Sequence, residues 1–334
     1  MNQYIRTPVD ALTARRLGLA SGWDRAALEA AQIQALQRTL RTAIQKSPWY
    51  ARHFAGLDPA SVRTGADLSG LPLLCASDIA DQGHALLCVS QSEVARIITL
   101  HTSGSTGTPK RLYFTRQDLD ATEDFFLHGM FSLISPQDAV LAMLPWEQPD
   151  STGDLLLRAL TQEGICCAGL WPPKAPQELA SLIQKESYTS IIGLPQHLLH
   201  LADCLPRGQV RTMLLCSDYA PHALRQRIEQ ACGCTTFLHY GTTETGLGGG
   251  VECAAHAGCH VRESELLVEI IDPDTEKVLP EGELGEVVVT TLNRQAMPLI
   301  RYRTKDMARL TTEPCVCTGR TARLYDISGR RNTC

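Results

Sequence analysis

Short apolar runs alternate with helix-like segments across the middle of the chain, between residues 97 and 239. The apolar runs lie at 97–100, 140–144, 190–194, 213–216 and 235–239, and the segments expected to form helices lie at 117–133, 153–164, 176–186 and 221–232. A helix between two strands returns the chain to the edge where the first strand began, so such strands pair in parallel. The alternation predicts an α/β fold with a mainly parallel sheet and helices on both of its faces.

The regions on either side of this alternation follow other patterns. Apolar residues at mixed three- and four-residue spacings predict an amphipathic helix over 24–46, which ends before a turn at Ser47 and Pro48. After Gly250 the chain becomes a series of short β-branched runs and turns, typical of a distorted antiparallel sheet or barrel. These runs lie at 266–271, 285–291 and 299–303. The expected organisation is an N-terminal helical segment packed on the core (1–90), an α/β core (91–250) and a β-rich subdomain (251–334).

The segment 101–110, HTSGSTGTPK, combines glycines, hydroxyl side chains and a lysine directly after an apolar run. Glycines let successive backbone N–H groups converge on an anion, hydroxyls add donors, and Lys110 adds a positive charge. The spacing is not the Walker pattern, because Gly104 and Gly107 stand three residues apart and a proline precedes the lysine. An ordinary surface turn has the same composition, so the segment alone leaves both interpretations open.

Other characteristic segments accompany this one in a defined order along the chain. HYGTTETGLGGG (239–250) is a glycine-rich turn with an acidic residue, and PLIRYRTKD (298–306) is a strand-like basic run. LQRTLRTAIQKSPWYARHFAGLDPASV near the N-terminus and VEIIDPDTEKVLPEGELGEVVVTTLNRQAMPLIRYRTKD near the other end complete the set. The ordered set resembles the adenylate-forming (AMP-forming) acyl and aryl CoA ligases, within them the phenylacetate-CoA ligase-like branch, over nearly the whole chain. The resemblance implies that family's large domain, with mixed, mainly parallel sheets flanked by helices and a distorted antiparallel barrel-like subdomain near the C-terminus.

The resemblance implies ATP-dependent activation of a carboxylic acid to an acyl- or aryl-adenylate with release of pyrophosphate. The acid attacks the α-phosphorus, and cations and N–H donors must meet the charge of the leaving pyrophosphate. The loop after residue 101 would hold the β- and γ-phosphates, with Lys110 at its edge. Its expected contacts are Thr102, Ser103, Gly104, Ser105, Thr106 and Gly107.

The glycine-rich turn matches the family tetrad through Tyr240, Gly241, Thr243 and Glu244. The resemblance implies that Tyr240 stacks on adenine and that Thr243 faces the α-phosphate. Glu244 would bind Mg²⁺, because a carboxylate beside a triphosphate is repelled unless a divalent cation lies between them. Without the other motifs, Glu244 would be interpreted as part of a solvated turn.

Further nucleotide contacts follow from the resemblance. Asp306 would accept hydrogen bonds from the ribose hydroxyls, and Arg330 would be a second ribose contact; a surface salt bridge is the alternative for each. The family usually has glycine where this chain has Lys305. The adenine edge would be bounded by Ser217, Asp218 and Tyr219.

The acyl pocket is less well marked. Candidate lining residues are Phe125, Phe126, Met130 and Trp146, which core packing explains equally well, and glycines at 246–250 would allow a close approach of the acyl group to the backbone. These residues name no particular acid.

Cys253, His260, Cys315 and Cys317 have the composition of a closed, structural zinc site. Cys259 and His256 are rival ligands, and unligated surface residues are the alternative. The phenylacetate-ligase-like branch often has cysteines and a histidine at matching places. Zinc here would join two loops and leave no open position for water or substrate.

Beyond the SGR segment, the family usually has a mobile C-terminal lid domain with a catalytic lysine and the surface that admits CoA, whereas this chain stops at Cys334. A cropped chain, natural absence of the domain and a partner chain that supplies it are the open explanations. We expect ATP or AMP binding to survive and thioester formation to be the step in doubt. The expected partners are a small carboxylic acid, CoA or a carrier or acceptor protein thiol, a separate C-terminal domain, and a second copy forming a homodimer.

Composition excludes several other classes. The net charge of −5 provides no basic surface for nucleic acid, and neither a membrane-spanning run nor a signal peptide is expected. Thirteen cysteines without a secretion signal suggest reduced thiols in a cytoplasmic protein rather than a disulfide scaffold. Two other functions remain at this point: a nucleotide sensor or subunit without turnover, and a zinc-stapled interaction module with coincidental glycine-rich loops.

Overall fold

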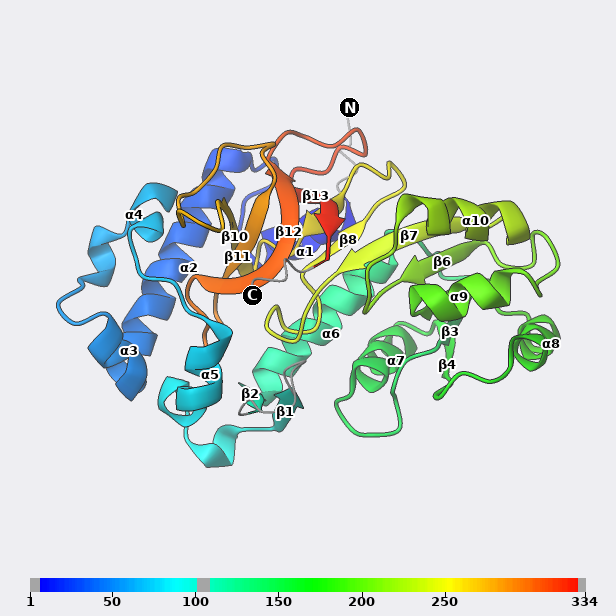
Figure 1. Ribbon diagram of the computed structural model, residues 1–334, viewed down its shortest axis with the longest axis horizontal. Helices are drawn as coiled ribbons and strands as arrows, with labels where there is room; N and C mark the ends of the chain where they lie inside the picture. Colours follow the sequence, from blue (N-terminus) through cyan, green and yellow to red (C-terminus); the bar gives the residue numbers. More distant parts are fainter. Residues whose placement is uncertain (1–6, 101–108, 330–334) are drawn as a thin grey trace.

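An 11-stranded mixed sheet organises the computed structural model, which describes residues 7–100 and 109–329 (Figure 1). In spatial order its strands are β10 (Leu266–Ile271), β11 (Gly285–Thr291), β12 (Tyr302–Thr311), β13 (Arg323–Ser328), β9 (Cys259–Val261), β8 (Gly250–Glu252), β7 (Thr235–Tyr240), β6 (Thr212–Leu215), β5 (Ser190–Gly193), β3 (Ala139–Ala142) and β4 (Cys166–Gly169). The strands from β7 to β4 are parallel, and the strands from β10 to β8 are antiparallel. The predicted α/β class with a mainly parallel core and an antiparallel β-rich end is confirmed.

Helices lie along and around this sheet. Within the described residues they are α1 (Pro8–Leu17), α2 (Arg25–Lys46), α3 (Pro48–His53), α4 (Gly65–Ser69), α5 (Ala76–Gln82), α6 (Arg116–Met130), α7 (Thr152–Gln162), α8 (Pro176–Glu186), α9 (Pro195–Ala202) and α10 (His222–Cys232), with short 3₁₀ turns η1 (Pro59–Ser61), η2 (Gly83–Leu86) and η3 (Gln91–Glu93). The expected helix over 24–46 is α2, which begins after the cap Asp24 and ends at Ser47. Ser47 then caps α3 through its side chain, so the predicted turn separates two helices.

Both faces of the parallel strands are covered by helices, as the alternation predicts. In β3, Val140 and Ala142 belong to the same apolar cluster as residues of α6 and α7. Leu141 between them belongs to a second cluster with residues of α8, α9 and α10. Successive side chains of a strand point to opposite faces, so the two clusters are the two sides of one sheet.

The apolar run at 97–100 departs from the prediction of parallel pairing. It forms β1 (Arg96–Leu100), which pairs antiparallel with β2 (Lys110–Phe114) in a separate two-stranded sheet. Too few residues separate β1 from β2 for a crossover helix, and a short connection allows only antiparallel pairing. The hairpin places Lys110 opposite Leu100.

The strand expected at 299–303 is also displaced, because β12 begins only at Tyr302. The backbone N–H groups of Leu299, Ile300 and Arg301 donate to the hydroxyls of Thr291, Tyr50 and Thr290. These bonds to side chains replace the backbone hydrogen bonds to a neighbouring strand that a β-strand requires. Tyr50, from the SPWY motif, also donates to Pro298 O over 2.9 Å, so this motif fastens α3 beneath the basic run.

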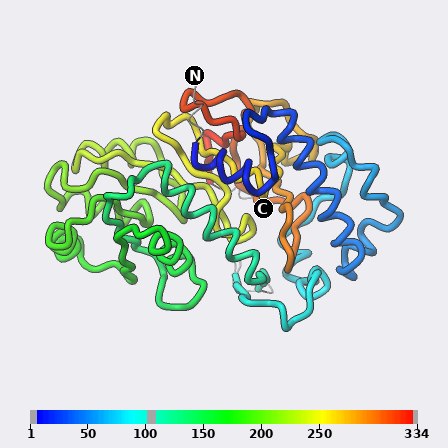
Figure 2. The backbone as a smooth tube through the Cα atoms, turned by 180° about the vertical axis from the view of Figure 1, so that it is seen from behind, coloured from blue at the N-terminus to red at the C-terminus, as the bar shows by residue number. Residues whose placement is uncertain are grey.

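The N-terminal segment lies on the β-rich half of the molecule, and the chain from α7 to α10 forms the other half (Figures 1 and 2). Leu74 is bonded to the start of β12: its N–H donates to Arg301 O, and Arg303 N donates to its carbonyl. Strand pairing is continuous across residue 250, since β7 pairs with β8. Among the described helices, none combines the length and apolar character needed to cross a membrane.

Candidate active site

A cavity of about 820 Å³ opens where the parallel strands meet the antiparallel ones. The carboxyl ends of β5, β6 and β7 contribute Ile192, Leu214 and Tyr240, and α6 contributes a wall of apolar residues. Ligands of α/β sheets bind beyond the carboxyl ends of the strands, because the loops that follow them converge there. The cavity is therefore where the predicted nucleotide site should lie.

The turn after β7 brings Gly241, Thr243 and Glu244 to this cavity. Gly246 N donates to Thr243 O and Leu247 N donates to Thr242 O, which closes the turn on itself. Gly246 has φ of +78°, a conformation that glycine adopts without a steric penalty. Arg294 donates from Nη1 to the Glu244 carbonyl over 2.7 Å and fixes the turn from behind.

Glu244 is buried at the cavity wall and forms an ion pair with Lys110, the first residue of β2. Tyr302 OH lies 2.9 Å from both Glu244 Oε1 and Lys110 Nζ. Burial by itself raises the pKa of Glu244, but the Lys110 ammonium and the hydrogen bonds to the carboxylate together outweigh burial and hold the pKa below its ordinary value. The carboxylate is thus ionised, and an ammonium group lies where a cation is expected.

Tyr240 and Asp306 meet across the cavity, where Tyr240 OH donates to Asp306 Oδ2 over 3.1 Å. Asp306 lies in a bulge of β12, since the register with β11 shifts between the Glu286–Met307 and Val288–Arg303 pairs. Bulges re-aim side chains, and this one directs Asp306 into the cavity. Lys305 has φ of +66°, which explains why glycine would suit its position.

The segment after β6 supplies the remaining predicted contacts that the structure describes. Ser217, Asp218 and Tyr219 all line the cavity. Ser217 has φ of +67° and turns the chain, and Asp218 accepts a bond from Tyr219 N over 2.7 Å. Half of the Tyr219 side chain is exposed, so its ring is available at the rim.

The other predicted nucleotide contacts lie outside the described residues. They are Thr102, Ser103, Gly104, Ser105, Thr106 and Gly107 in the loop, and Arg330 near the C-terminus. Their roles stay predictions.

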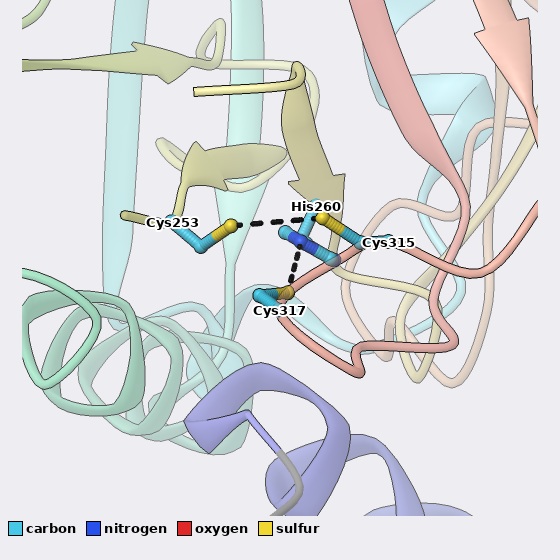
Figure 3. A group of neighbouring side chains, drawn as sticks. All are labelled: Cys253, His260, Cys315 and Cys317. Carbon is cyan, nitrogen blue, oxygen red and sulfur yellow. Dashed lines mark hydrogen bonds between the residues drawn. The ribbon is translucent and has the colours of Figure 1, made fainter. Parts of the chain in front are cut away.

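Cys253, His260, Cys315 and Cys317 gather at one point, although they come from β8–β9 and from the loop between β12 and β13 (Figure 3). Their ligand atoms all lie within 4.8 Å of one another. Cys253 Sγ and Cys315 Sγ are 3.9 Å apart, and Cys317 Sγ and His260 Nε2 are 3.4 Å apart. Two ligand atoms of a tetrahedral zinc ion with ordinary bond lengths lie about 3.8 Å apart when both are sulfur, and about 3.6 Å apart when one is sulfur and the other nitrogen.

The rival zinc ligands point elsewhere. Cys259 Sγ contacts Leu238 O, and His256 Nδ1 lies 3.3 Å from Glu252 Oε2. His260 Nδ1 lies 3.1 Å from Thr321 Oγ1, a second contact of the kind that orients a ligating imidazole. The donor set and its spacing therefore fit a structural zinc ion.

Sequence reasoning missed Tyr302, Arg294 and His239. Tyr302 and His239 stand inside motifs that were singled out, so their place in those motifs was the available signal. Arg294 also stands inside the resembling segment 268–306, but only the fold brings it to the Glu244 carbonyl.

Comparison with known proteins points to one enzyme family. The family model described as "AMP-binding enzyme" matches residues 62–294. The phenylacetate-coenzyme A ligase of Thermus thermophilus is 30% identical over 320 residues, covering 91% of this chain and 70% of that protein. That of Escherichia coli (strain K12) is 30% identical over 318 residues, covering 91% and 71%. An open conformation of 2-hydroxyisobutyryl-CoA ligase, solved with 2-HIB-AMP and CoA, superposes with a TM-score of 0.81 at 20% identity, covering 92% of this chain and 76% of that one, which shows a shared fold.

Proposed function

The chain belongs to the AMP-binding enzyme family and is an adenylate-forming ligase, and we propose that it converts a small carboxylic acid to its adenylate and then to its CoA thioester. The first step joins the acid oxygen to the α-phosphorus of ATP and releases pyrophosphate. In the second step the CoA thiol displaces AMP from the acyl carbon. The names of the two relatives as phenylacetate-coenzyme A ligases support CoA as the acceptor.

The nucleotide would occupy the cavity between β7 and the bulge of β12. Tyr240 and the 217–219 segment would contact adenine, and Asp306 would accept bonds from the ribose hydroxyls. Thr243 would donate to the α-phosphate, and the loop that precedes Lys110 would hold the β- and γ-phosphates. The observation that carries this proposal is the convergence of Tyr240, Glu244 and Asp306 on one cavity.

Magnesium fits the same site, because Glu244 offers a buried, ionised oxygen ligand of the type that this hard cation prefers. When bound, the ion supplies positive charge to the phosphate oxygens. Lys110 would leave Glu244 and contact the phosphates instead. This exchange keeps both charged side chains paired before and after nucleotide binding.

Zinc would be held by Cys253, His260, Cys315 and Cys317 in a structural role. All four tetrahedral positions would be filled by the protein. The ion would fasten the loop between β12 and β13 to the β8–β9 hairpin and would take no part in the reaction.

The test is ATP–pyrophosphate exchange with a panel of aryl, arylalkyl and aliphatic acids, followed by mass spectrometry of products formed with CoA. We expect exchange that depends on an acid and on magnesium, and an acyl-CoA product with the same acid. Absence of exchange with every acid would contradict adenylation, and exchange without acyl-CoA would contradict CoA as the acceptor.

A further inference from the structure

One half of the cavity is left without a role by the nucleotide contacts. Its walls come from α6, α7 and the start of β8, and its lining includes Phe125, Phe126, Met130, Leu156 and Val251. Among the described residues of this half, no charged side chain is present. An apolar wall next to the predicted α-phosphate position suits the body of the acid that is activated there.

His239 is the imidazole that faces this apolar half. It lies on β7, directly before Tyr240, and pairs in register with Val251 of β8. Its ring centroid is 6.5 Å from the rings of both Phe125 and Phe126. The sequence places an aromatic nitrogen heterocycle, rather than another aliphatic residue, among these rings.

Gly241 makes room for this imidazole. A methyl group on Gly241 would lie only 2.7 Å from His239 Cε1, closer than any carbon contact allows. The imidazole therefore lies against the backbone of the turn that carries Thr243 and Glu244. This contact brings His239 next to the predicted reaction centre.

The ring of His239 has unused hydrogen-bonding capacity. Its Nε2 is buried and has no hydrogen-bond partner among the described residues. Buried polar atoms are normally paired, so an unpaired one beside a cavity indicates a ligand that supplies the partner. Burial also lowers the pKa of His239 to about 4, so the ring is neutral at physiological pH.

We propose that His239 is a specificity-determining residue that hydrogen-bonds a hydroxyl substituent on an otherwise apolar carboxylic acid. This inference rests on the proposed function and names its substrate class. A neutral imidazole has one donor and one acceptor nitrogen, and a hydroxyl can pair with either. A half turn of the ring about χ2 exchanges nitrogen and carbon positions, so either nitrogen can be presented to the cavity.

A charged substituent is disfavoured at the same place. The apolar half offers no counter-ion within the described part of the chain, and a buried charge needs a partner. Acids without any polar substituent would bury the unpaired nitrogen permanently. A site built to bond a substrate hydroxyl rejects the analogue without it strongly for this reason.

The experiment measures kcat/KM for acid-dependent ATP–pyrophosphate exchange with phenylacetate, benzoate and hexanoate, each beside its monohydroxylated isomers. The proteins are the full chain, His239→Leu, which removes both nitrogens, and His239→Gln, which keeps a donor and an acceptor. AMP binding, measured by calorimetry, reports folding and the nucleotide half of the cavity in each variant.

We expect the wild type to prefer at least one hydroxylated isomer over its parent by about tenfold or more. In His239→Leu, the values of kcat/KM for the hydroxylated acid and its parent should differ by less than about threefold. His239→Gln should keep part of the preference, and AMP binding should be unchanged in both variants. A ratio that is the same in wild type and His239→Leu, or a wild type that prefers the parent acid in every series, overturns the inference alone. Exchange with no acid at all, despite AMP binding, overturns the proposed function and the inference with it.

Discussion

Glu244 and Lys110 form a buried ion pair in the cavity, with only 3% and 9% of their side chains exposed. Such a pair adds little net stability, because the loss of hydration offsets the attraction. In the proposed site, the pair would keep the Glu244 carboxylate ionised in an apolar wall until a cation and phosphates replace the Lys110 ammonium.

Glu244→Gln should therefore lower acid-dependent pyrophosphate exchange by about 100-fold or more, since the charge that would hold magnesium is lost. AMP affinity should change little, because AMP lacks the phosphates that the ion would contact. Both are measured on the same preparation, by exchange of labelled pyrophosphate and by calorimetry.

Glu269→Gln is the matched control. Like Glu244, Glu269 is a buried carboxylate in an ion pair, here with Arg301, but it lies outside the cavity. This substitution should cost similar stability and leave exchange within about threefold of wild type. Equal loss of exchange in both variants would contradict the role given to Glu244.

The sequence located these residues through motifs but could not show how they pair. The ion pair of Lys110 with Glu244 joins positions far apart in the chain, which no local spacing encodes. Lys305 is the converse case: its departure from the usual glycine pointed to an unusual turn, and its positive φ and the bulge at Asp306 agree with that.

Asp138 links the starts of three parallel strands on the side opposite the cavity. It accepts bonds from Ser135 before β3, from Thr189 before β5 and from Arg211 before β6. Burial alone raises its pKa, but these donors outweigh it and lower the pKa from 3.8 to about 2. Aligning one end of the strands also aligns the carboxyl ends that line the cavity.

Because the folded pKa is depressed, the stabilisation by Asp138 is present above pH 4 and is lost as pH falls from about 4 to 2. Asp138→Asn should lower the free energy of unfolding by about 1–2 kcal/mol at pH 7 and flatten its pH dependence in that window. Urea unfolding of wild type and variant between pH 2.5 and 7 measures both effects.

The exposed pair of Asp203 with Arg227 offers the control. Asp203→Asn should change unfolding by less than about 0.5 kcal/mol, since surface ion pairs contribute little. A variant at Asp138 that keeps the full acid dependence of the wild type would contradict its role.

Elements with a strong periodic signal were predicted well, and so was the parallel pairing of the central strands, but the partner of one apolar run was not. The helix over 24–46 and the strands at 266–271 and 285–291 match α2, β10 and β11. The run at 97–100 was assigned to the parallel sheet, although its connection forces a hairpin. Strand partners depend on contacts between distant residues, which the local pattern does not contain.

The cluster of Cys253, His260, Cys315 and Cys317 joins distant parts of the chain. The loop that carries Cys315 and Cys317 continues to Arg320 and Thr321, whose N–H groups both donate to the buried Asp10 of α1. A metal ion at this loop would thus stabilise the β8–β9 hairpin and the docking of the first helix together.

Cys317→Ser should reduce bound zinc from about one equivalent to well below half and lower Tm by about 5–10 °C. Elemental analysis and calorimetric melting measure these effects, and the exposed Cys166→Ser is the control. Purified wild type without any tetrahedral metal, or with a melting temperature insensitive to chelators, would contradict the zinc assignment.

The sequence indicates a change of strand pattern near residue 250, but it does not show that one continuous sheet extends across this position. The strands do change there from parallel to antiparallel, but β7 and β8 pair with each other across residue 250. The cavity lies at that junction, so the proposed nucleotide contacts come from both sides: Tyr240 ends the parallel strand β7, Glu244 follows it, and Asp306 comes from the antiparallel strands.

A crystal structure with ATP and magnesium tests the central claim most directly. We predict adenine beside Tyr240 and Tyr219, a ribose hydroxyl on Asp306, magnesium on Glu244, and Lys110 moved from Glu244 to the phosphates. A nucleotide bound elsewhere, or an intact contact between Lys110 and Glu244 with the nucleotide in place, would contradict it.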